Sequence, residues 1–261
     1  MKALAARRRH PMALAVLLLL GLLLTGGAYA MFTNSASANA QQVSAQDIAE
    51  GEKLFVANCA TCHGMNAEGS ENGPSLIGVG AAAVDFQVGT GRMPLQMHGP
   101  QAARKAPQFN EEETAQLAAY VASLAPGPAI PDDEYLDPAL GDPAAGGGLF
   151  RTNCAMCHNV VGSGGALTRG KYAPSLSGVS ERHIYEAMQT GPQNMPKFND
   201  ASLTPEEKRD IIAYLDEINT MTAPGGFKLG SLGPVAEGLF IWFFGLGAVI
   251  GLTVWLSARA K

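Results

Sequence analysis

The stretch Asn58–Met65 reads NCATCHGM, and a near copy, NCAMCHNV, spans residues 153–160. Each copy has two cysteines separated by two residues, with a histidine directly after the second cysteine. The C-x-x-C-H pattern is typical of a covalent c-type haem site, in which two thiols add to the haem vinyl groups and the histidine becomes an axial ligand. The residues predicted to hold two covalently bound haem c groups are Cys59, Cys62, His63, Cys154, Cys157 and His158.

Other interpretations of paired cysteines explain less of the pattern. Two close pairs in a structural zinc site usually lie about 15–20 residues apart, whereas Cys59 and Cys154 are 95 residues apart. A thioredoxin-like redox pair would accompany a βαβ pattern that this sequence lacks. Two ordinary disulfides would account for all four cysteines, but none of these interpretations uses the histidine that follows each pair.

Each copy also contains a Met-Pro dipeptide after a Thr-Gly dipeptide, as TGRMP with Met93 and as TGPQNMP with Met195. A methionine thioether is the usual second axial ligand of electron-transfer c-type haems, and it raises the reduction potential. Met97 and His98 remain alternative ligands for the first haem. Because the protein would fill both axial positions, we expect electron transfer between partners and no independent catalysis. The predicted iron ligands are His63, Met93, His158 and Met195.

The sequence between the two ends of the chain contains an internal repeat of two similar copies. The offset between the copies is 95 residues at Cys154, 102 at Met195 and 94 at Tyr214, so insertions separate the two copies within loops. A period near 100 residues indicates a pair of domains rather than a solenoid. We predict a first domain at residues 44–125, a Pro/Gly/acidic linker of semi-extended chain at 126–145, and a second domain at 146–222.

Helical signals dominate both copies. Asn110 and Glu113 have the spacing of a capping box, and Thr204 with Glu207 repeats it before a second apolar stripe. Neither copy contains a convincing run of alternating strand residues. The sequence therefore predicts a mainly α body with long loops, in which His183 lies on a surface helix and has no role.

The two ends of the chain are apolar. Residues 1–40 have basic, apolar and small-residue parts, as in an export signal, and Ala38-Asn39-Ala40 offers a cleavage site. The same run is about long enough for a membrane anchor, so both interpretations remain open. Gly238–Leu256 has no charge, carries tryptophans near both ends and precedes Arg259, which predicts a transmembrane helix at 236–257 with a cytoplasmic C-terminus.

The charge of the body restricts its partners. The whole chain has a net charge of −5, but residues 41–235 contain 12 basic and 22 acidic side chains, a balance of −10. Nucleic acid binding requires clustered Lys and Arg, so we expect no nucleic acid partner. The acidic surface would suit a basic docking partner, although acidic solvated surfaces are also common without one.

Each repeat resembles a class I cytochrome c domain. In that family a glycine and an aromatic residue before the cysteines pack against an aromatic on the C-terminal helix, and a proline segment helps to fix the haem histidine. The positions that match this pattern are Gly51, Phe55, Pro74 and Tyr120 in the first copy, and Gly146, Phe150, Pro174 and Tyr214 in the second.

The chain from residue 44 onward resembles a narrower family, the dihaem cytochrome c subunits of actinobacterial-type cytochrome bc complexes, which are menaquinol/ubiquinol–cytochrome c reductases. The stretches GPSLIGVG, VGTGRMP, GGALTRGKYAPSL and TGPQNMPKF carry this resemblance. It implies a subunit of a proton-translocating oxidoreductase in the plasma membrane, with its haem domains on the extracytoplasmic side. It also implies a cytochrome b subunit, a Rieske iron–sulfur subunit and a cytochrome c oxidase as partners.

The motifs leave other functions open. An independent membrane-anchored dihaem carrier would have the same haem ligands, and so would a dihaem subunit of an oxidase. A dihaem peroxidase would need one haem that loses its sixth ligand, whereas both copies here offer a methionine. The spacing does not say which haem receives electrons and which delivers them.

Overall fold

The computed structural model describes residues 11–36, 43–221 and 234–259. These residues fall into two compact units, Met1–Ser44 and Ala45–Lys261. In the first unit, helix α2 (Pro11–Ala36) carries no acidic side chain in its first turn and no basic one in its last. The predicted cleavage site at Ala38-Asn39-Ala40 lies outside the described residues.

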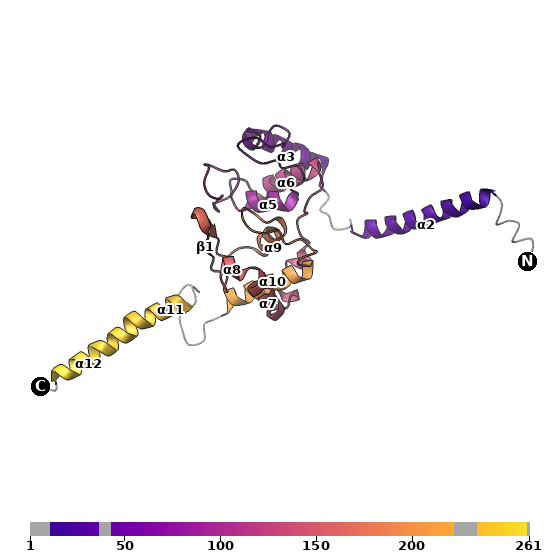
Figure 1. The fold of residues 1–261 in the computed structure, drawn as a ribbon. Helices are drawn as coiled ribbons and strands as arrows, with labels where there is room; N and C mark the ends of the chain where they lie inside the picture. Colours follow the sequence, from indigo (N-terminus) through magenta and orange to yellow (C-terminus); the bar gives the residue numbers. More distant parts are fainter. Residues whose placement is uncertain (1–10, 37–42, 222–233, 260–261) are drawn as a thin grey trace, which may run out of the picture. The chain divides into compact units, whose positions relative to one another are not determined.

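Two helices cross at the centre of the first domain. Helix α3 packs against helix α6, with helix α5 beside α6 (Figure 1). Gly51 makes the crossing close, because a Cβ atom at this position would collide with the backbone carbonyl of Gln116. The rings of Phe55 and Tyr120 lie 5.2 Å apart at the same crossing, which confirms the contact expected from the family resemblance. The helices are α3 (Ala45–Asn58), α4 (Ala60–His63), α5 (Ala81–Gly89) and α6 (Glu111–Leu124).

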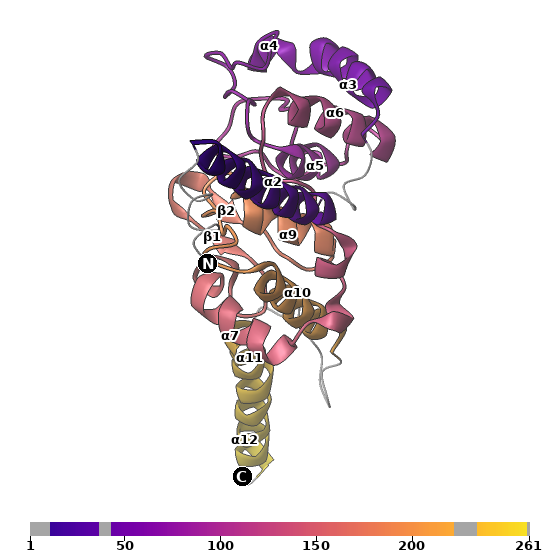
Figure 2. The same ribbon diagram turned by 90° about the vertical axis from the view of Figure 1, so that its right-hand side faces the viewer.

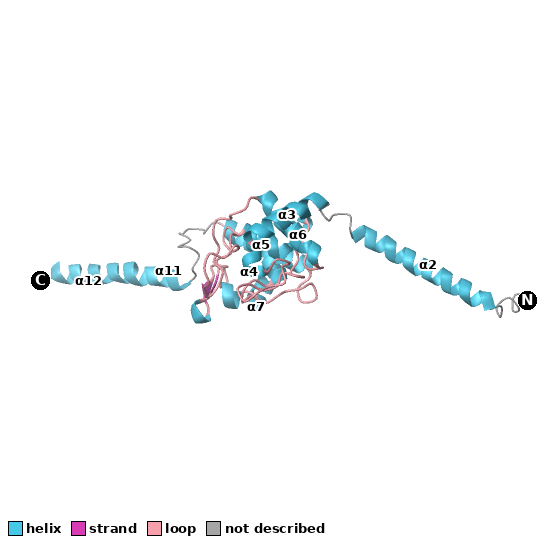
Figure 3. Ribbon diagram, turned by 90° about the horizontal axis from the view of Figure 1, so that it is seen from above, coloured by secondary structure: helices cyan, strands magenta, loops and turns pink. Residues whose placement is uncertain are grey.

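The second domain has the same arrangement of two crossing helices. Helix α7 crosses helix α10, and a Cβ atom at Gly146 would collide with the backbone carbonyl of Asp210. The rings of Phe150 and Tyr214 lie 5.4 Å apart. Long loops connect the helices (Figure 3). The elements are α7 (Pro143–Asn153), α8 (Ala155–His158), β1 (Gly165–Ala166), η3 (Thr168–Gly170), β2 (Tyr172–Ala173), α9 (Glu181–Thr190) and α10 (Pro205–Thr220).

Both predicted capping boxes are present. The Asn110 side chain accepts a hydrogen bond from the Glu113 N–H, while the Glu113 carboxylate accepts one from the Asn110 N–H. Thr204 and Glu207 form the same reciprocal pair at the start of α10. Each box satisfies two backbone donors that would otherwise lack partners at a helix N-terminus. The sequence therefore predicted the starts of α6 and α10 correctly.

The predicted linker is more structured than its composition suggested. Short 3-10 helices η1 (Asp133–Tyr135) and η2 (Pro138–Leu140) occupy it, and α7 begins at Pro143 with Asp142 as its N-cap. The predicted second domain at 146–222 thus starts inside a helix. We predicted semi-extended chain up to residue 145, whereas α7 already begins at Pro143, and the absence of a side chain at Gly146 allows the close crossing with α10.

The two domains pack against each other through helices α5 and α9, which come from equivalent places in the two repeats (Figures 1 and 2). His183 on α9 lies at this contact, with its ring 6.1 Å from the ring of Phe86 on α5. The prediction that His183 lies on a surface helix is therefore wrong. The helix is amphipathic, as a surface helix would be, but the first domain covers part of its polar face.

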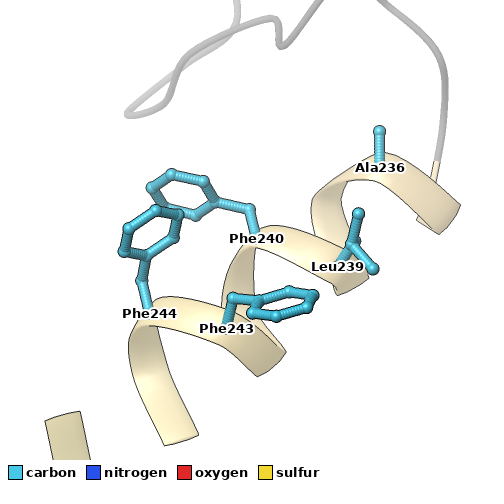
Figure 4. Close-up of a pocket in the computed structure, with 5 residues that line it drawn as sticks. All are labelled: Ala236, Leu239, Phe240, Phe243 and Phe244. Atoms are coloured by element: carbon cyan, nitrogen blue, oxygen red, sulfur yellow. The ribbon is translucent and has the colours of Figure 1, made fainter. Parts of the chain in front are cut away.

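The C-terminal segment comprises α11 (Pro234–Phe240), a π-helical stretch (Ile241–Leu246) and α12 (Gly247–Arg259). Residues Ala236–Arg259 are long and apolar enough to cross a membrane. Aromatic side chains gather near its start, where the rings of Phe240 and Phe244 lie 4.7 Å apart (Figure 4). At the other end, the Arg259 guanidinium lies 4.5 Å from the centre of the Trp255 ring.

Candidate haem-binding sites

Each C-x-x-C-H motif is held where a helix of the core ends. The Cys59 N–H donates to the carbonyl of Phe55 over 2.7 Å, and the Cys154 N–H donates to that of Phe150 over 2.8 Å. Both phenylalanines are almost fully buried. The core therefore fixes the backbone from which the motif starts, and a single helical turn, α4 or α8, carries the chain on to the histidine.

The two motif histidines have the same backbone partner. His63 Nδ1 lies 2.7 Å from the carbonyl oxygen of Pro74, and His158 Nδ1 lies 3.0 Å from that of Pro174. A carbonyl can only accept a hydrogen bond, so Nδ1 carries the proton in each neutral ring. This arrangement leaves Nε2 free as a ligand and fixes the orientation of the ring, as outer partners of metal-bound histidines do.

The first thiol of each pair is not activated. Burial, and then the neighbouring Cys62, raises the pKa of Cys59 to about 11. Burial and Cys157 raise the pKa of Cys154 to about 11 in the same way. A reactive or redox-active cysteine needs a lowered pKa, because the thiolate is the nucleophile. The interpretation of either pair as a thioredoxin-like centre therefore has no support in the environment of its first thiol.

The predicted ligands of the second domain share one cavity of about 200 Å³. The burial of His158 lowers its pKa, which favours the neutral imidazole that coordinates a metal. A mostly apolar cavity with two thiols, an imidazole and a thioether in its wall has the donor groups that haem c requires. The predicted ligands in its wall are Cys154, Cys157, His158 and Met195, and apolar neighbours include Phe150, Met188, Ile211 and Leu215.

The first domain supplies part of the wall of this cavity. The Arg92 side chain is 8% exposed, and its guanidinium lies 4.6 Å from the centre of the Phe86 ring. Among the described residues, no carboxylate lies within 4 Å of Arg92 or Arg104. A buried cation without a counter-charge is costly, and the two propionates of a haem would compensate it. The first-domain residues in the wall are Phe86, Thr90, Arg92, Gln101, Ala102 and Arg104.

The sequence pattern did not single out Arg92 and Arg104. Their one available signal was the position of Arg92 directly before Met93, and that position suggests a role in the first domain rather than in the second. Only the packing of α5 against α9 brings Arg92 to the other domain's cavity.

Two of the predicted first-domain ligands, Met93 and Cys59, are oriented by the core. Met93 and Cys59 both pack against the core cluster that contains Phe55, and His63 stands at the end of α4. The two alternative ligands face solvent, with Met97 79% exposed and His98 also exposed. Of these three candidates, Met93 is therefore the one that the core already orients.

Comparison with known proteins agrees with this geometry. Residues 48–125 match the family model described as cytochrome c, and residues 141–215 match that described as cytochrome C oxidase, cbb3-type, subunit III. A cytochrome bc1 complex cytochrome c subunit of Corynebacterium efficiens is 46% identical over 89% of this chain and 84% of its own length. This chain belongs to that family.

Other members support the assignment. The cytochrome bc1 complex cytochrome c subunit of Mycobacterium tuberculosis (strain CDC 1551 / Oshkosh) is 46% identical over 97% of this chain and 93% of its own length. That of Corynebacterium diphtheriae is 42% identical over 99% of both chains. Family membership confirms the resemblance found in the sequence and the mainly α class with two cytochrome c-type domains. Such domains imply covalently bound haem c.

Proposed function

We propose that this chain is the electron-transfer subunit of a quinol–cytochrome c reductase and that it carries two haem c groups in series. In the first domain, Cys59 and Cys62 would form the thioether bonds, with His63 and Met93 as axial ligands. The corresponding residues of the second domain are Cys154, Cys157, His158 and Met195. The observation that carries the proposal is the cavity that brings the last four residues together behind a wall built partly by the first domain.

The chain's own residues would tune and position the haems. Haem c supplies a one-electron iron couple, whose potential methionine ligation raises. Pro74 and Pro174 orient the two imidazoles through their carbonyl oxygens. The cores around Phe55 and Phe150 hold the motifs rigid, which reduces reorganisation when the charge on the iron changes. Because protein side chains fill both axial positions, the chain would pass electrons without binding substrate at iron.

Contact between the domains supports electron transfer within one chain. Met93 follows Arg92 directly, and Arg92 lies in the wall of the second domain's cavity. The proposed iron ligand of the first haem is therefore the sequence neighbour of a residue in the wall of the second haem's cavity. We propose that electrons enter from a Rieske iron–sulfur protein, cross this contact, and leave to a cytochrome c oxidase in a supercomplex.

We further propose that the haem domains lie on the extracytoplasmic side of the plasma membrane. The helix Ala236–Arg259 would anchor them, and Arg259 would lie on the cytoplasmic side according to the positive-inside rule. The phenylalanines near its start (Figure 4) give the anchor a bulky apolar face that suits packing against a helix of a cytochrome b subunit.

A spectrum of the complex tests the proposal. The full chain would be tagged in its native host, purified in mild detergent, and examined by reduced-minus-oxidised difference spectroscopy. We expect b-type haem bands in stoichiometric amount beside the c-type bands, and two c-type haems per copy of this chain.

Two results would contradict the proposal in different ways. If c-type bands alone appear after purification in several mild detergents, the chain is an independent membrane-anchored carrier. If a-type haem copurifies in equal amount without b-type haem, the chain is a subunit of an oxidase instead.

A further inference from the structure

The contact between the two domains contains a cluster of ionisable side chains that the haem sites do not use. Asp85 lies on α5 of the first domain, and His183 and Glu186 lie one helical turn apart on α9 of the second. One ligand atom from each of the three side chains lies within 4.8 Å of the other two. His183 Nε2 and Asp85 Oδ2 are 3.7 Å apart.

Glu186 is the member of the cluster that most requires explanation. Its side chain is fully buried, and neither carboxylate oxygen has a hydrogen-bond partner of good geometry among the described residues. At the equivalent place in the first repeat the chain has Phe86, an apolar residue that suits a buried position. A buried carboxylate without partners is strongly destabilising as an anion, so the site requires either a proton or a cation.

The three side chains have the chemistry of a transition-metal site. Histidine and glutamate three residues apart on one helix face the same side, a spacing that metal-binding helices use. One imidazole and two carboxylates suit zinc or a similar divalent ion, with a water completing four-coordinate geometry. Ligand bonds of about 2.0–2.2 Å would require the three groups to move closer by roughly an ångström, which side-chain rotation allows.

The surroundings favour a neutral imidazole at His183 and, while no metal ion is bound, a protonated Glu186 whose proton the ion would displace. Burial is the main cause that lowers the pKa of His183, so the ring is uncharged at neutral pH. Burial, and then Asp85, raises the pKa of Glu186 to about 10. The nearby cations are Arg92, Arg104 and Arg182, which oppose a metal ion, whereas the two carboxylates favour it.

We propose that Asp85, His183 and Glu186 form a binding site for a divalent transition-metal ion, with zinc as the fitting representative, that joins the two cytochrome domains. Neither domain holds more than two of the ligands, so the ion would bind tightly only when the domains are docked. Metal binding would in turn stabilise the docked arrangement and hold the first-domain wall against the second domain's cavity.

Zinc binding to the haem-loaded, full-length chain in detergent tests this proposal. After treatment with a chelator, the protein would be equilibrated with Zn²⁺, desalted and analysed for zinc and iron by mass spectrometry. The wild type should retain one zinc per chain. His183→Gln and Glu186→Gln should lower the zinc affinity at least 100-fold, and Asp85→Asn, in the other domain, should lower it at least tenfold.

His98→Gln is the matched control, because it removes an exposed imidazole outside the cluster. It should retain one zinc per chain. The haem spectrum of every variant reports whether it has folded, and only variants with a wild-type spectrum are compared. Zinc should also raise the thermal transition of the wild type and of His98→Gln, but not that of His183→Gln, because binding to the folded state alone stabilises it.

Two results would overturn the proposal. A wild-type chain that retains no zinc would show that Asp85, His183 and Glu186 do not form a zinc site. A His183→Gln variant that retains zinc as tightly as the wild type would show that the ion binds elsewhere.

Discussion

The two cytochrome domains share a helical frame but have their long loops in different places. Pro74 follows His63 by 11 residues, whereas Pro174 follows His158 by 16. The longer second-domain segment contains the small β1–β2 hairpin. Duplicated domains keep their core and diverge in their loops, because loops tolerate insertion at little energetic cost.

The opposite difference occurs after the methionines. Phe198 follows Met195 by three positions, whereas Phe109 follows Met93 by 16. The long first-domain loop reaches the second domain, where the Tyr172 N–H donates to the Gln101 side chain over 2.8 Å. The two insertions therefore meet. A difference that looks like neutral drift in the sequence forms part of the interface in the structure.

The largest expected effect tests whether the domains bind haem independently. Replacing Cys154 and Cys157 together by Ala should remove covalent haem from the second domain and leave the first loaded, because all thioether bonds of one haem come from one motif. Haem content per chain, measured by the pyridine haemochrome spectrum, should fall to half. The matched variant Cys59→Ala/Cys62→Ala should give the same loss, and a loss of both haems from either variant would contradict independence.

The second effect concerns the axial methionines. Met195→Leu and Met93→Leu should each keep covalent haem but lower the potential of one haem, on the order of 100 mV or more, since the thioether ligand stabilises ferrous iron. Potentiometric titration followed by visible spectra measures this change. The exposed Met97 supplies the control, because Met97→Leu should change neither potential. If Met97→Leu lowers a potential and Met93→Leu does not, the ligand assignment in the first domain is wrong.

The third effect compares the close helix crossing of the first domain with that of the second. Gly51→Ala and Gly146→Ala should each destabilise their domain by about 1–3 kcal/mol, because the added methyl group meets the backbone of the crossing helix. Chemical denaturation of the haem-loaded chain, followed by circular dichroism, measures the loss.

Gly148 offers a matched control within the same helix α7. A Cβ atom at this position meets nothing within 4 Å, so Gly148→Ala should be neutral or stabilise by roughly 0.5–1 kcal/mol through backbone entropy. Equal losses at Gly148 and Gly146 would show that the close helix crossing is not the cause.

The smallest expected effect concerns Arg92, a first-domain residue that lies in the wall of the second domain's cavity. Arg92→Gln, in the first domain, should lower the potential of the second haem by several tens of millivolts, on the order of 1–2 kcal/mol, because it removes a buried positive charge beside that cavity. The exposed Arg151 belongs to the second domain itself, and Arg151→Gln should have a smaller effect. If only the potential of the first haem changes, the Arg92 charge acts on the first haem and not on the second.

Much of the fold could be predicted because its signals are local. The capping residues Asn110 and Thr204 determine where helices begin through hydrogen bonds three residues away, and any sequence pattern of that length can reveal them. The C-x-x-C-H motif likewise contains three contacting groups within five residues. The contact between Phe150 and Tyr214 was also foreseen, although through family resemblance and not through spacing.

The tertiary structure decided what depends on the contact between the domains. The sequence predicted His183 on a surface helix, and nothing in the local sequence distinguishes Glu186 from a solvated acid. Their burial results from the packing of α5 against α9, residues that lie about 100 positions apart. The same packing turns Arg92 toward the second domain's cavity. The sequence by itself determined the two domains and their haem motifs, whereas the structure decided how the pair is joined, because long-range packing leaves no periodic mark in the chain.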